Sequence, residues 1–145
     1  MKNYIILIFS FLTLQFINAQ SEGSLVEQTL QNYMEGSSYN KLEMLESAFT
    51  KNASLYLTNS NGEFKIYTPK EYAAFFKNRG VGEFNGRYAK VLAIEIIKDI
   101  ATAKVEIRIS KKGMIYIDLF LLKKTSDGWK IISKTATRID NTETK

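Results

Sequence analysis

The apolar residues in the first half of the chain recur at helical spacing. They predict an amphipathic helix over residues 24–35 and a second, short helix over residues 42–49. A third helix is expected to begin at Pro69, because Thr68 is placed as its N-cap and Glu71 as the reciprocal partner in a capping box. These patterns place three helices ahead of the main run of strands.

Strand patterns begin between the second and third helices and fill the second half of the chain. Strict alternation of apolar and polar residues over residues 101–109 indicates a strand with one buried face. The nearly continuous apolar run over residues 114–122 indicates a strand that is covered on both faces. The predicted strands span residues 53–57, 64–67, 87–98, 101–109, 114–122 and 129–139. No repeat or linker divides them, so the sequence predicts one α+β domain.

Two turns determine how the last three strands would pair. If Lys112–Gly113 and Asp127–Gly128 are two-residue turns, Asp118 faces Ile107 on one neighbouring strand and Thr137 on the other. A slip of one residue in either turn would exchange these partners. In this register the sheet face toward the helices carries Val105, Ile107, Ile109, Tyr116, Asp118, Phe120, Leu122, Trp129, Ile131, Ser133, Thr135 and Thr137.

The opposite face of these strands carries an apolar stripe with a charged border. The stripe consists of Ile117, Leu119, Leu121, Ile132 and Ala136. The border consists of Lys104, Glu106, Arg108, Lys130, Lys134 and Arg138. An apolar patch rimmed by charges is typical of protein interfaces, so we expect a homodimer through this outer sheet face. The alternative is that loops of the same chain cover it.

Residues 1–19 have the layout of a secretory signal peptide. Lys2 gives a positive start, an apolar run covers residues 4–14, and Ala19 ends the segment with a small residue. The run is shorter than the roughly 20 residues that a membrane-spanning helix needs. We therefore expect cleavage between Ala19 and Gln20 and export to the periplasm or the exterior, an uncleaved anchor being the alternative. The rest divides into a disordered start, a domain and a polar tail, over residues 20–23, 24–139 and 140–145.

Composition removes several kinds of chemistry. The 145 residues include no His and no Cys, which excludes a Ser-His-Asp triad, a thiolate nucleophile, a Cys/His zinc site and disulfides. Acidic clusters of the kind that hold calcium or magnesium are also missing, so we expect no metal and no cofactor. The net charge of +5 comes from basic residues scattered among acidic ones, and export separates the protein from nucleic acid. Nucleic acid is therefore not expected as a partner.

Four stretches of the sequence, residues 29–36, 48–53, 116–123 and 127–134, resemble a known group of proteins. In this order and spacing they resemble the nuclear transport factor 2-like superfamily of cystatin-like α+β folds, and within it the branch called "Putative lumazine-binding". The resemblance implies three N-terminal helices packed on a strongly curved, mainly antiparallel sheet, which together form a cone with an internal cavity. It does not imply one activity, because this fold carries isomerases, dehydratases, cyclases, binding proteins and interaction modules.

Asp118 is the one acidic residue within an apolar strand run. A buried carboxylate is costly unless it is hydrogen-bonded, and its pKa tends to rise. Asp118 is therefore a candidate general base or ligand anchor. The alternative is a structural acid, for which the sequence offers as partners Tyr33, Thr137, Arg79 and Arg87.

Tyr33, on the inward face of the first helix, is the second candidate. In the ketosteroid isomerases that this fold includes, a tyrosine at a similar position helps to form the oxyanion hole, and a catalytic acid follows the second helix. The corresponding position falls near Leu57, where no acid stands, which argues against isomerase chemistry.

The high aromatic content of this small domain would suit a flat heterocyclic ligand, although such residues also fill cores. The residues predicted to bind a ligand are Asp118, Tyr33, Tyr116, Phe120, Trp129, Thr135, Thr137 and Phe75. The sequence thus predicts an exported, non-enzymatic protein that binds a small aromatic or heterocyclic molecule. The alternatives are an isomerase or dehydratase with Asp118 as base and Tyr33 as acid, and a homodimeric interaction module without a ligand.

Overall fold

The computed structural model describes residues 21–140. The predicted signal peptide, its cleavage site and all but the first residue of the predicted polar tail lie outside the described residues. Within residues 21–140, none of the helices has the length and apolar character needed to cross a membrane.

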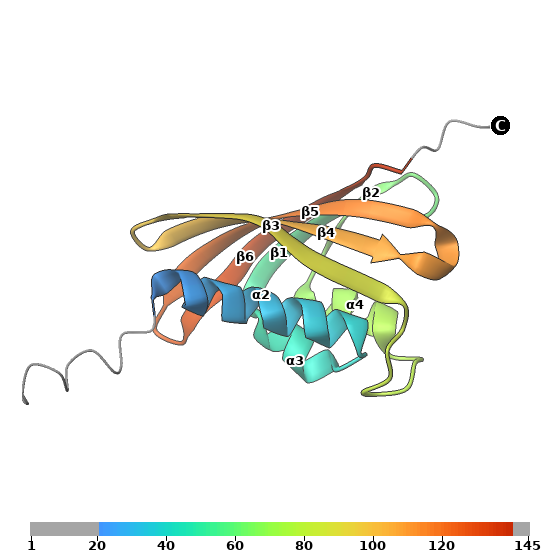
Figure 1. Ribbon diagram of the computed structural model, residues 1–145, viewed down its shortest axis with the longest axis horizontal. Helices are drawn as coiled ribbons and strands as arrows, with labels where there is room; N and C mark the ends of the chain where they lie inside the picture. The colour runs from blue at the N-terminus through green and yellow to red at the C-terminus, as the bar shows by residue number, and fades with distance from the viewer. Residues whose placement is uncertain (1–20, 141–145) are drawn as a thin grey trace, which may run out of the picture.

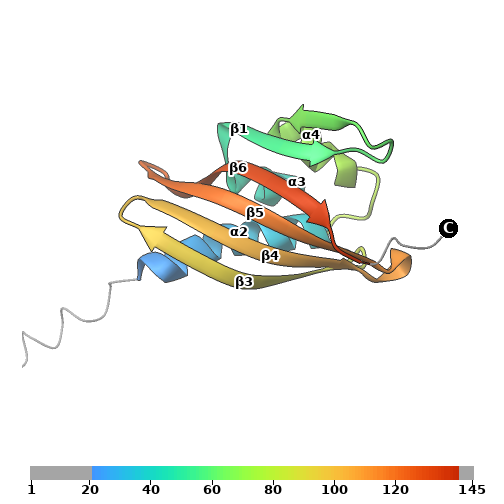
Figure 2. The same ribbon diagram turned by 90° about the horizontal axis from the view of Figure 1, so that it is seen from above.

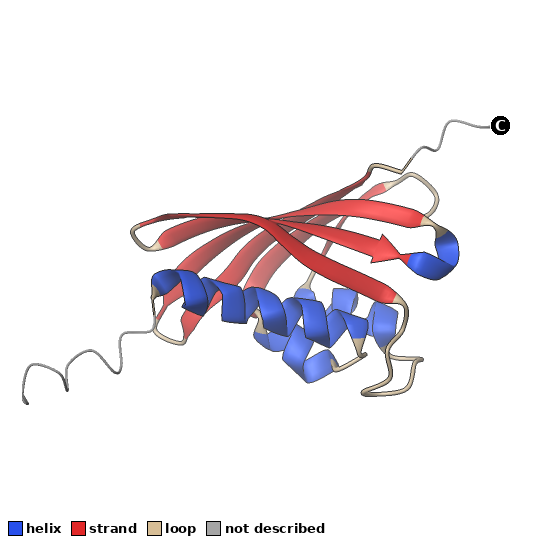
Figure 3. Ribbon diagram, viewed as in Figure 1, coloured by secondary structure: helices blue, strands red, loops and turns tan. Residues whose placement is uncertain are grey.

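Helices cover one face of a six-stranded sheet (Figures 1 and 3). The helical elements are α2 (Glu22–Ser38), α3 (Leu42–Ser47), α4 (Pro69–Ala73) and the 3-10 turns η2 (Ala74–Phe76) and η3 (Ser110–Lys112). The strands are β1 (Phe49–Thr58), β2 (Phe64–Tyr67), β3 (Arg87–Ile97), β4 (Ile100–Ile109), β5 (Met114–Thr125) and β6 (Gly128–Arg138). The strand order is β2-β1-β6-β5-β4-β3, and only the β1–β6 pair is parallel. The predicted α+β class, the three helices and all six strands are confirmed.

The helix α2 lies along the sheet and contributes much of the core. Ser21 caps it by accepting a hydrogen bond from the backbone N–H of Ser24, so the helix begins at Glu22 rather than at residue 24. Residues 22 and 23 are therefore helical, which corrects their assignment to a disordered start. At the other end Gly36 lets α3 approach closely, because a Cβ built there would lie only 2.6 Å from the backbone nitrogen of Leu45.

The capping box predicted for the third helix is present. The Thr68 side chain accepts from the Glu71 backbone N–H at 3.2 Å, and the Glu71 carboxylate accepts from the Thr68 backbone N–H at 2.7 Å. Pro69 stands at the first helical position, where its missing N–H costs nothing. The helix α4 is short and continues as η2, and it brings Tyr72 to the interior.

Both hairpin turns differ from the predicted ones. The β4–β5 loop includes η3, so Asp118 pairs with Val105 rather than with Ile107. The β5–β6 hairpin closes with Thr125 opposite Gly128 rather than with Ser126 opposite Trp129. Each difference moves the pairing by two positions, which leaves the faces of the strands unchanged because side chains alternate with a period of two.

A β-bulge then changes the face of the second half of β6. The partners pass from Leu122–Ile131 to Leu121–Ser133, so Ile132 is the extra residue on β6. Beyond the bulge Asp118 pairs with Ala136 and Phe120 with Lys134. Lys134 and Ala136 therefore lie on the inner face, which corrects their assignment to the outer surface.

The same bulge turns Ser133, Thr135 and Thr137 to the outer face, although the sequence register placed them inside. The outer face is not covered by helices and is seen directly in Figure 2. Of the predicted apolar stripe, Leu119 and Leu121 lie exposed on this face, and Ile117 there is half-buried. Tyr56 on β1, Thr135 on β6 and Leu119 on β5 pair in one row across it.

Candidate functional site

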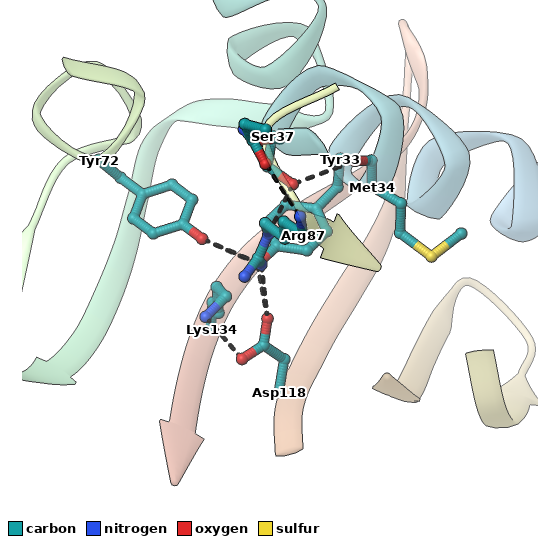
Figure 4. A network of polar contacts seen from close by, with 8 residues as sticks. Tyr33, Met34, Ser37, Tyr72, Arg87, Asp118 and Lys134 are labelled. Carbon is teal, nitrogen blue, oxygen red and sulfur yellow. Dashed lines mark hydrogen bonds and ion pairs between the residues drawn. The ribbon is translucent and has the colours of Figure 1, made fainter. Parts of the chain in front are cut away.

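The centre of the interior holds a cluster of polar side chains (Figure 4). Five of the described elements each contribute one member, and each side chain is at least nine-tenths buried. The interior cluster consists of Tyr33 from α2, Tyr72 from α4, Arg87 from β3, Asp118 from β5 and Lys134 from β6. Aromatic rings surround it, since Phe120 lies edge-on to the Tyr33 ring with centroids 4.8 Å apart.

The hydrogen bonds of the Tyr33 hydroxyl fix its proton. The Tyr33 hydroxyl donates to Asp118 Oδ2 at 2.6 Å. Its oxygen accepts from Arg87 Nη2 at 2.7 Å and lies 2.9 Å from the Tyr72 hydroxyl. Because a phenol has one proton, Tyr72 must be the donor in the contact between the two tyrosines. The Tyr33 hydroxyl thus uses its proton inside the cluster.

Two cations flank the one carboxylate. Arg87 Nη2 lies 3.4 Å from Asp118 Oδ2, and Lys134 Nζ lies 3.2 Å from Asp118 Oδ1. The Lys134 ammonium also faces aromatic rings, at 5.3 Å from the centroid of Tyr72 and 5.8 Å from that of Tyr33. With these side chains in their ordinary charge states, the interior cluster carries one positive charge in excess.

Burial and neighbouring charges shift the ionisation of the cluster. Burial is the largest cause that raises the pKa of Tyr33 well above its usual value, and the Asp118 carboxylate raises it further. Burial works against the charge on Arg87, but the surrounding Tyr33, Tyr72 and Asp118 outweigh it, and the pKa of Arg87 is raised. Tyr33 therefore acts as a neutral hydroxyl beside a charged guanidinium at neutral pH.

The interior cluster is closed on itself. Among the residues that the structure describes, every fully buried side-chain nitrogen and oxygen has a hydrogen-bond partner. Ser37 completes the set by accepting from Arg87 Nε at 3.1 Å. Such a network holds its members in fixed positions, but it offers a ligand no free group on Tyr33 or Asp118.

A groove of about 440 Å³ lies beside the interior cluster, between the second half of α2 and the start of β3. This volume falls within the range typical of small-molecule sites, roughly 300–1,000 Å³. The groove is lined by Gln31, Met34, Glu35, Ser38, Tyr39, Phe84, Arg87, Tyr88 and Ala89. Arg87 is the one residue that belongs to both the groove and the interior cluster. A molecule in the groove would therefore contact the cluster at Arg87.

The family profile described as "Putative lumazine-binding" matches residues 21–136. The chain belongs to this family. The match spans every element that contributes to the interior cluster and to the groove. No curated protein resembles the chain closely enough in sequence to count as a match.

Solved structures with the same fold include proteins described as NTF2-like and as ketosteroid isomerase-like. An NTF2-like protein of unknown function from Shewanella baltica aligns with a TM-score of 0.72 and 18% identity, over 86% of this chain and 98% of that chain. An NTF2-like protein of unknown function from Silicibacter pomeroyi also aligns with a TM-score of 0.72 and 18% identity, and the alignment covers 85% of this chain and 100% of that chain. A ketosteroid isomerase-like protein from Erwinia carotovora atroseptica aligns with a TM-score of 0.61 and 15% identity, and the alignment covers 83% of this chain and 98% of that chain. At these identities the likeness shows the fold alone, and it confirms the expected nuclear transport factor 2-like fold.

In this family member, the predicted site residues fall into two groups. Tyr33, Asp118 and Phe120 come together in the interior, and of the structural partners considered for Asp118, Tyr33 and Arg87 contact it. The other five predicted residues lie elsewhere. The Trp129 ring donates to Glu22 at 2.7 Å, and the Tyr116 hydroxyl points to the sulfur of Met114.

The remaining three predicted residues are outside the interior. Thr135 and Thr137 are exposed on the outer face, and the Thr135 hydroxyl donates to the backbone oxygen of Tyr56 at 2.9 Å. Phe75 is exposed on η2, where it packs edge-on against Tyr67 and Tyr72. Neither the outer-face threonines nor Phe75 lines the groove.

Sequence reasoning missed Lys134 and most of the groove. The spacing of Lys130 and Lys134 resembles that of a solvated strand face, and only the bulge sends Lys134 inward. The groove combines α2 with the loop before β3, and no local pattern joins these segments. One signal was available, since the aromatic residues Tyr39, Phe84 and Tyr88 stand next to turn residues rather than in the apolar pattern of a core.

Proposed function

We propose that this protein is an exported, non-enzymatic protein that binds a small molecule in the groove between α2 and β3. The observation that carries the proposal is the contrast between the closed interior cluster and the open groove of about 440 Å³ beside it. The family description indicates the chemical class of the ligand, since a lumazine is a small flat heterocycle. The aromatic side chains in the groove are suited to contact such a ring.

The bonding of Tyr33 and Asp118 supports a non-enzymatic role. A general acid must have a proton to give to a substrate, and the Tyr33 hydroxyl gives its own to Asp118. A general base must have a free lone pair facing the substrate, and both Asp118 oxygens face cations of the same chain. At the position where an isomerase would need its acid, β1 carries Leu57.

Binding in the groove is tested by titrating residues 20–145 with lumazine and a library of neutral and charged heterocycles, followed by 1H–15N NMR. The expected result is a saturable shift of the Tyr88 and Ala89 amides for at least one compound, with the Leu119 amide unmoved. Tyr88→Ala should weaken that binding at least tenfold. Its matched control is Phe64→Ala, which removes an exposed ring on β2 outside the groove. Absence of any saturable shift would overturn the proposal and favour an interaction module without a ligand.

The outer sheet face supports a homodimer as the working form. Leu119 and Leu121 are exposed at its centre, and Tyr56 extends the apolar surface toward β1. Ala136 has left the expected stripe, and Thr135 and Thr137 lie on this face instead, which makes the surface more polar than predicted. In a two-fold dimer this face would pack against the same face of a second copy.

Export rests on the sequence of residues 1–19, which lie outside the described residues. Expression of the full chain in a bacterial host, followed by fractionation and intact mass measurement, tests it. The expected product is an extracytoplasmic protein that begins at Gln20. A cytoplasmic product that keeps Met1 or Lys2 would overturn export.

A further inference from the structure

We propose that the groove selects a planar aromatic anion, whose charged oxygen binds the Arg87 guanidinium while its ring lies against Tyr39, Phe84 and Tyr88. This inference rests on the proposed function, because it names the chemical class of the ligand in the same groove. It is carried by the contacts of Arg87, the charges around the groove and the arrangement of the three rings.

The first observation is that Arg87 has donors left over. Its Nε donates to Ser37 at 3.1 Å, and its Nη2 donates to Tyr33 at 2.7 Å and lies within 3.4 Å of Asp118 and Tyr72. Among the described residues, no hydrogen bond uses Nη1, although a guanidinium has five N–H donors.

The position of Nη1 follows from burial. Arg87 is 8% exposed overall, and no fully buried side-chain nitrogen within residues 21–140 lacks a partner. Nη1 is therefore not fully buried, and Arg87 lines the groove. The result is a charged donor group that is held rigidly from behind by Ser37, Tyr33 and Asp118. A donor fixed in this way loses little conformational freedom when an acceptor binds.

The second observation concerns charge. The interior cluster has two cations and one carboxylate, and one of the two cations, Arg87, also lines the groove. Glu35 is the one acidic side chain that lines the groove, and it forms an ion pair with Lys41. The charges at the groove thus sum to a positive site, which favours an anionic ligand over a neutral one.

The third observation is the set of exposed aromatic rings. Phe84 lies between Tyr39 and Tyr88, with ring centroids 5.6 Å and 4.7 Å away and interplanar angles of 49° and 65°. The three side chains remain between 38% and 55% exposed, and all of them line the groove. Rings tilted in this way present both faces and edges, so a flat aromatic ligand can pack against them.

The test compares three probes of similar size by calorimetry: benzoate, benzamide and cyclohexanecarboxylate. Benzoate is expected to bind at least tenfold more tightly than benzamide, which has the same ring without the charge. It should also exceed cyclohexanecarboxylate, which has the charge without the aromatic ring. Raising the salt concentration from 0.05 M to 0.5 M should weaken benzoate binding, because salt screens the attraction between the carboxylate and Arg87.

Two variants locate the binding. Arg87→Gln should remove the preference for benzoate over benzamide. Phe84→Ala should weaken the binding of both probes and leave the ratio of their affinities unchanged. Phe84 is exposed, so Phe84→Ala keeps the test usable if Arg87→Gln does not fold. Phe64→Ala should leave all three affinities unchanged.

The outcomes separate this inference from the proposed function. If benzamide binds as tightly as benzoate, or if a neutral heterocycle binds in the groove and benzoate does not, the selection of an anion is wrong while the groove remains a binding site. If no probe and no library compound binds, both proposals fail. A benzoate preference that survives Arg87→Gln would also overturn the role of Arg87.

Discussion

Lys134 Nζ lies 3.2 Å from Asp118 Oδ1, and both side chains are only 2% to 3% exposed. The two residues come from neighbouring strands, β6 and β5, and Lys134 has no second carboxylate among the ion pairs of the described residues. Asp118 therefore compensates both buried cations, Arg87 on one oxygen and Lys134 on the other. The carboxylate is the member on which the interior cluster depends most.

Removal of Asp118 should thus cost more stability than removal of Lys134. Asp118→Asn leaves two buried cations without a counter-charge, and we expect a loss of about 3–5 kcal/mol in the free energy of unfolding. Lys134→Met leaves Asp118 paired with Arg87 and hydrogen-bonded to Tyr33, so we expect a loss of about 2 kcal/mol. Urea denaturation of both variants measures the two values. The control is Lys124→Met, which breaks the exposed pair with Glu22 and should change stability by less than about 1 kcal/mol. Equal losses for Asp118→Asn and Lys134→Met would contradict this account of the cluster.

The raised pKa of Tyr33 predicts a loss of stability in alkali. Burial favours the neutral phenol in the folded protein, so the folded pKa lies above the unfolded value of about 10. The stabilisation is fully present below pH 10 and is lost as the pH rises toward the folded pKa, because the unfolded chain releases the proton first.

This alkaline effect can be isolated with a conservative variant. Above pH 10 the wild type should lose stability more steeply than Tyr33→Phe, by about 1.4 kcal/mol for each pH unit. Urea denaturation between pH 8 and pH 11.5 gives the slopes. Tyr56→Phe, which changes an exposed tyrosine on the outer face, should keep the wild-type slope. Parallel Tyr33→Phe and wild-type curves would show that Tyr33 has the same pKa in the folded and unfolded states, which would contradict the raised pKa.

The elements of this fold were predictable because each has a local signal. The capping box of Thr68 and Glu71 marks the start of α4, and alternation along residues 101–109 gives β4 its inner face. The inward direction of Asp118 was also correct, although its partner was not, because both turn errors moved the pairing by an even number of residues. The period of two in a strand makes the face robust against such errors.

The site was less predictable because it depends on one irregularity and on distant segments. The bulge at Ile132 has no signature in the sequence, and it exchanges the faces of Lys134 and Thr135. A lysine that would ordinarily be assigned to solvent therefore becomes a member of the core. Arg87 was available as a candidate partner for Asp118, but its second role in the groove follows only when α2 lies against β3.

Gly36 offers a test of the packing that positions α2. A Gly-to-Ala change inside a helix usually stabilises by about 1 kcal/mol. At Gly36 the new Cβ would lie 2.6 Å from the backbone of Leu45, so α3 would have to move. We expect Gly36→Ala to destabilise the protein by about 2 kcal/mol or more. Gly23→Ala, in the same helix, is the matched control, because its Cβ meets nothing closer than 3.7 Å. Thermal denaturation should rank Gly23→Ala at or above the wild type, and the reverse order of the two variants would contradict the close packing of α2 on α3.

The outer sheet face gives the prediction with the clearest consequence for assembly. In a homodimer that buries Leu119 and Leu121, a carboxylate at position 119 would be buried in the interface without its hydrating water. Leu119→Asp should therefore give a monomer at concentrations where the wild type is a dimer, as measured by sedimentation velocity. Val81→Asp is the matched control, because Val81 is the most exposed large apolar residue of the described chain and lies on the loop before β3. It should remain dimeric.

Because Leu119 does not line the groove, the Leu119→Asp monomer should keep its small-molecule affinity. A wild type that sediments as a monomer would overturn the dimer and leave the outer face open to a different partner.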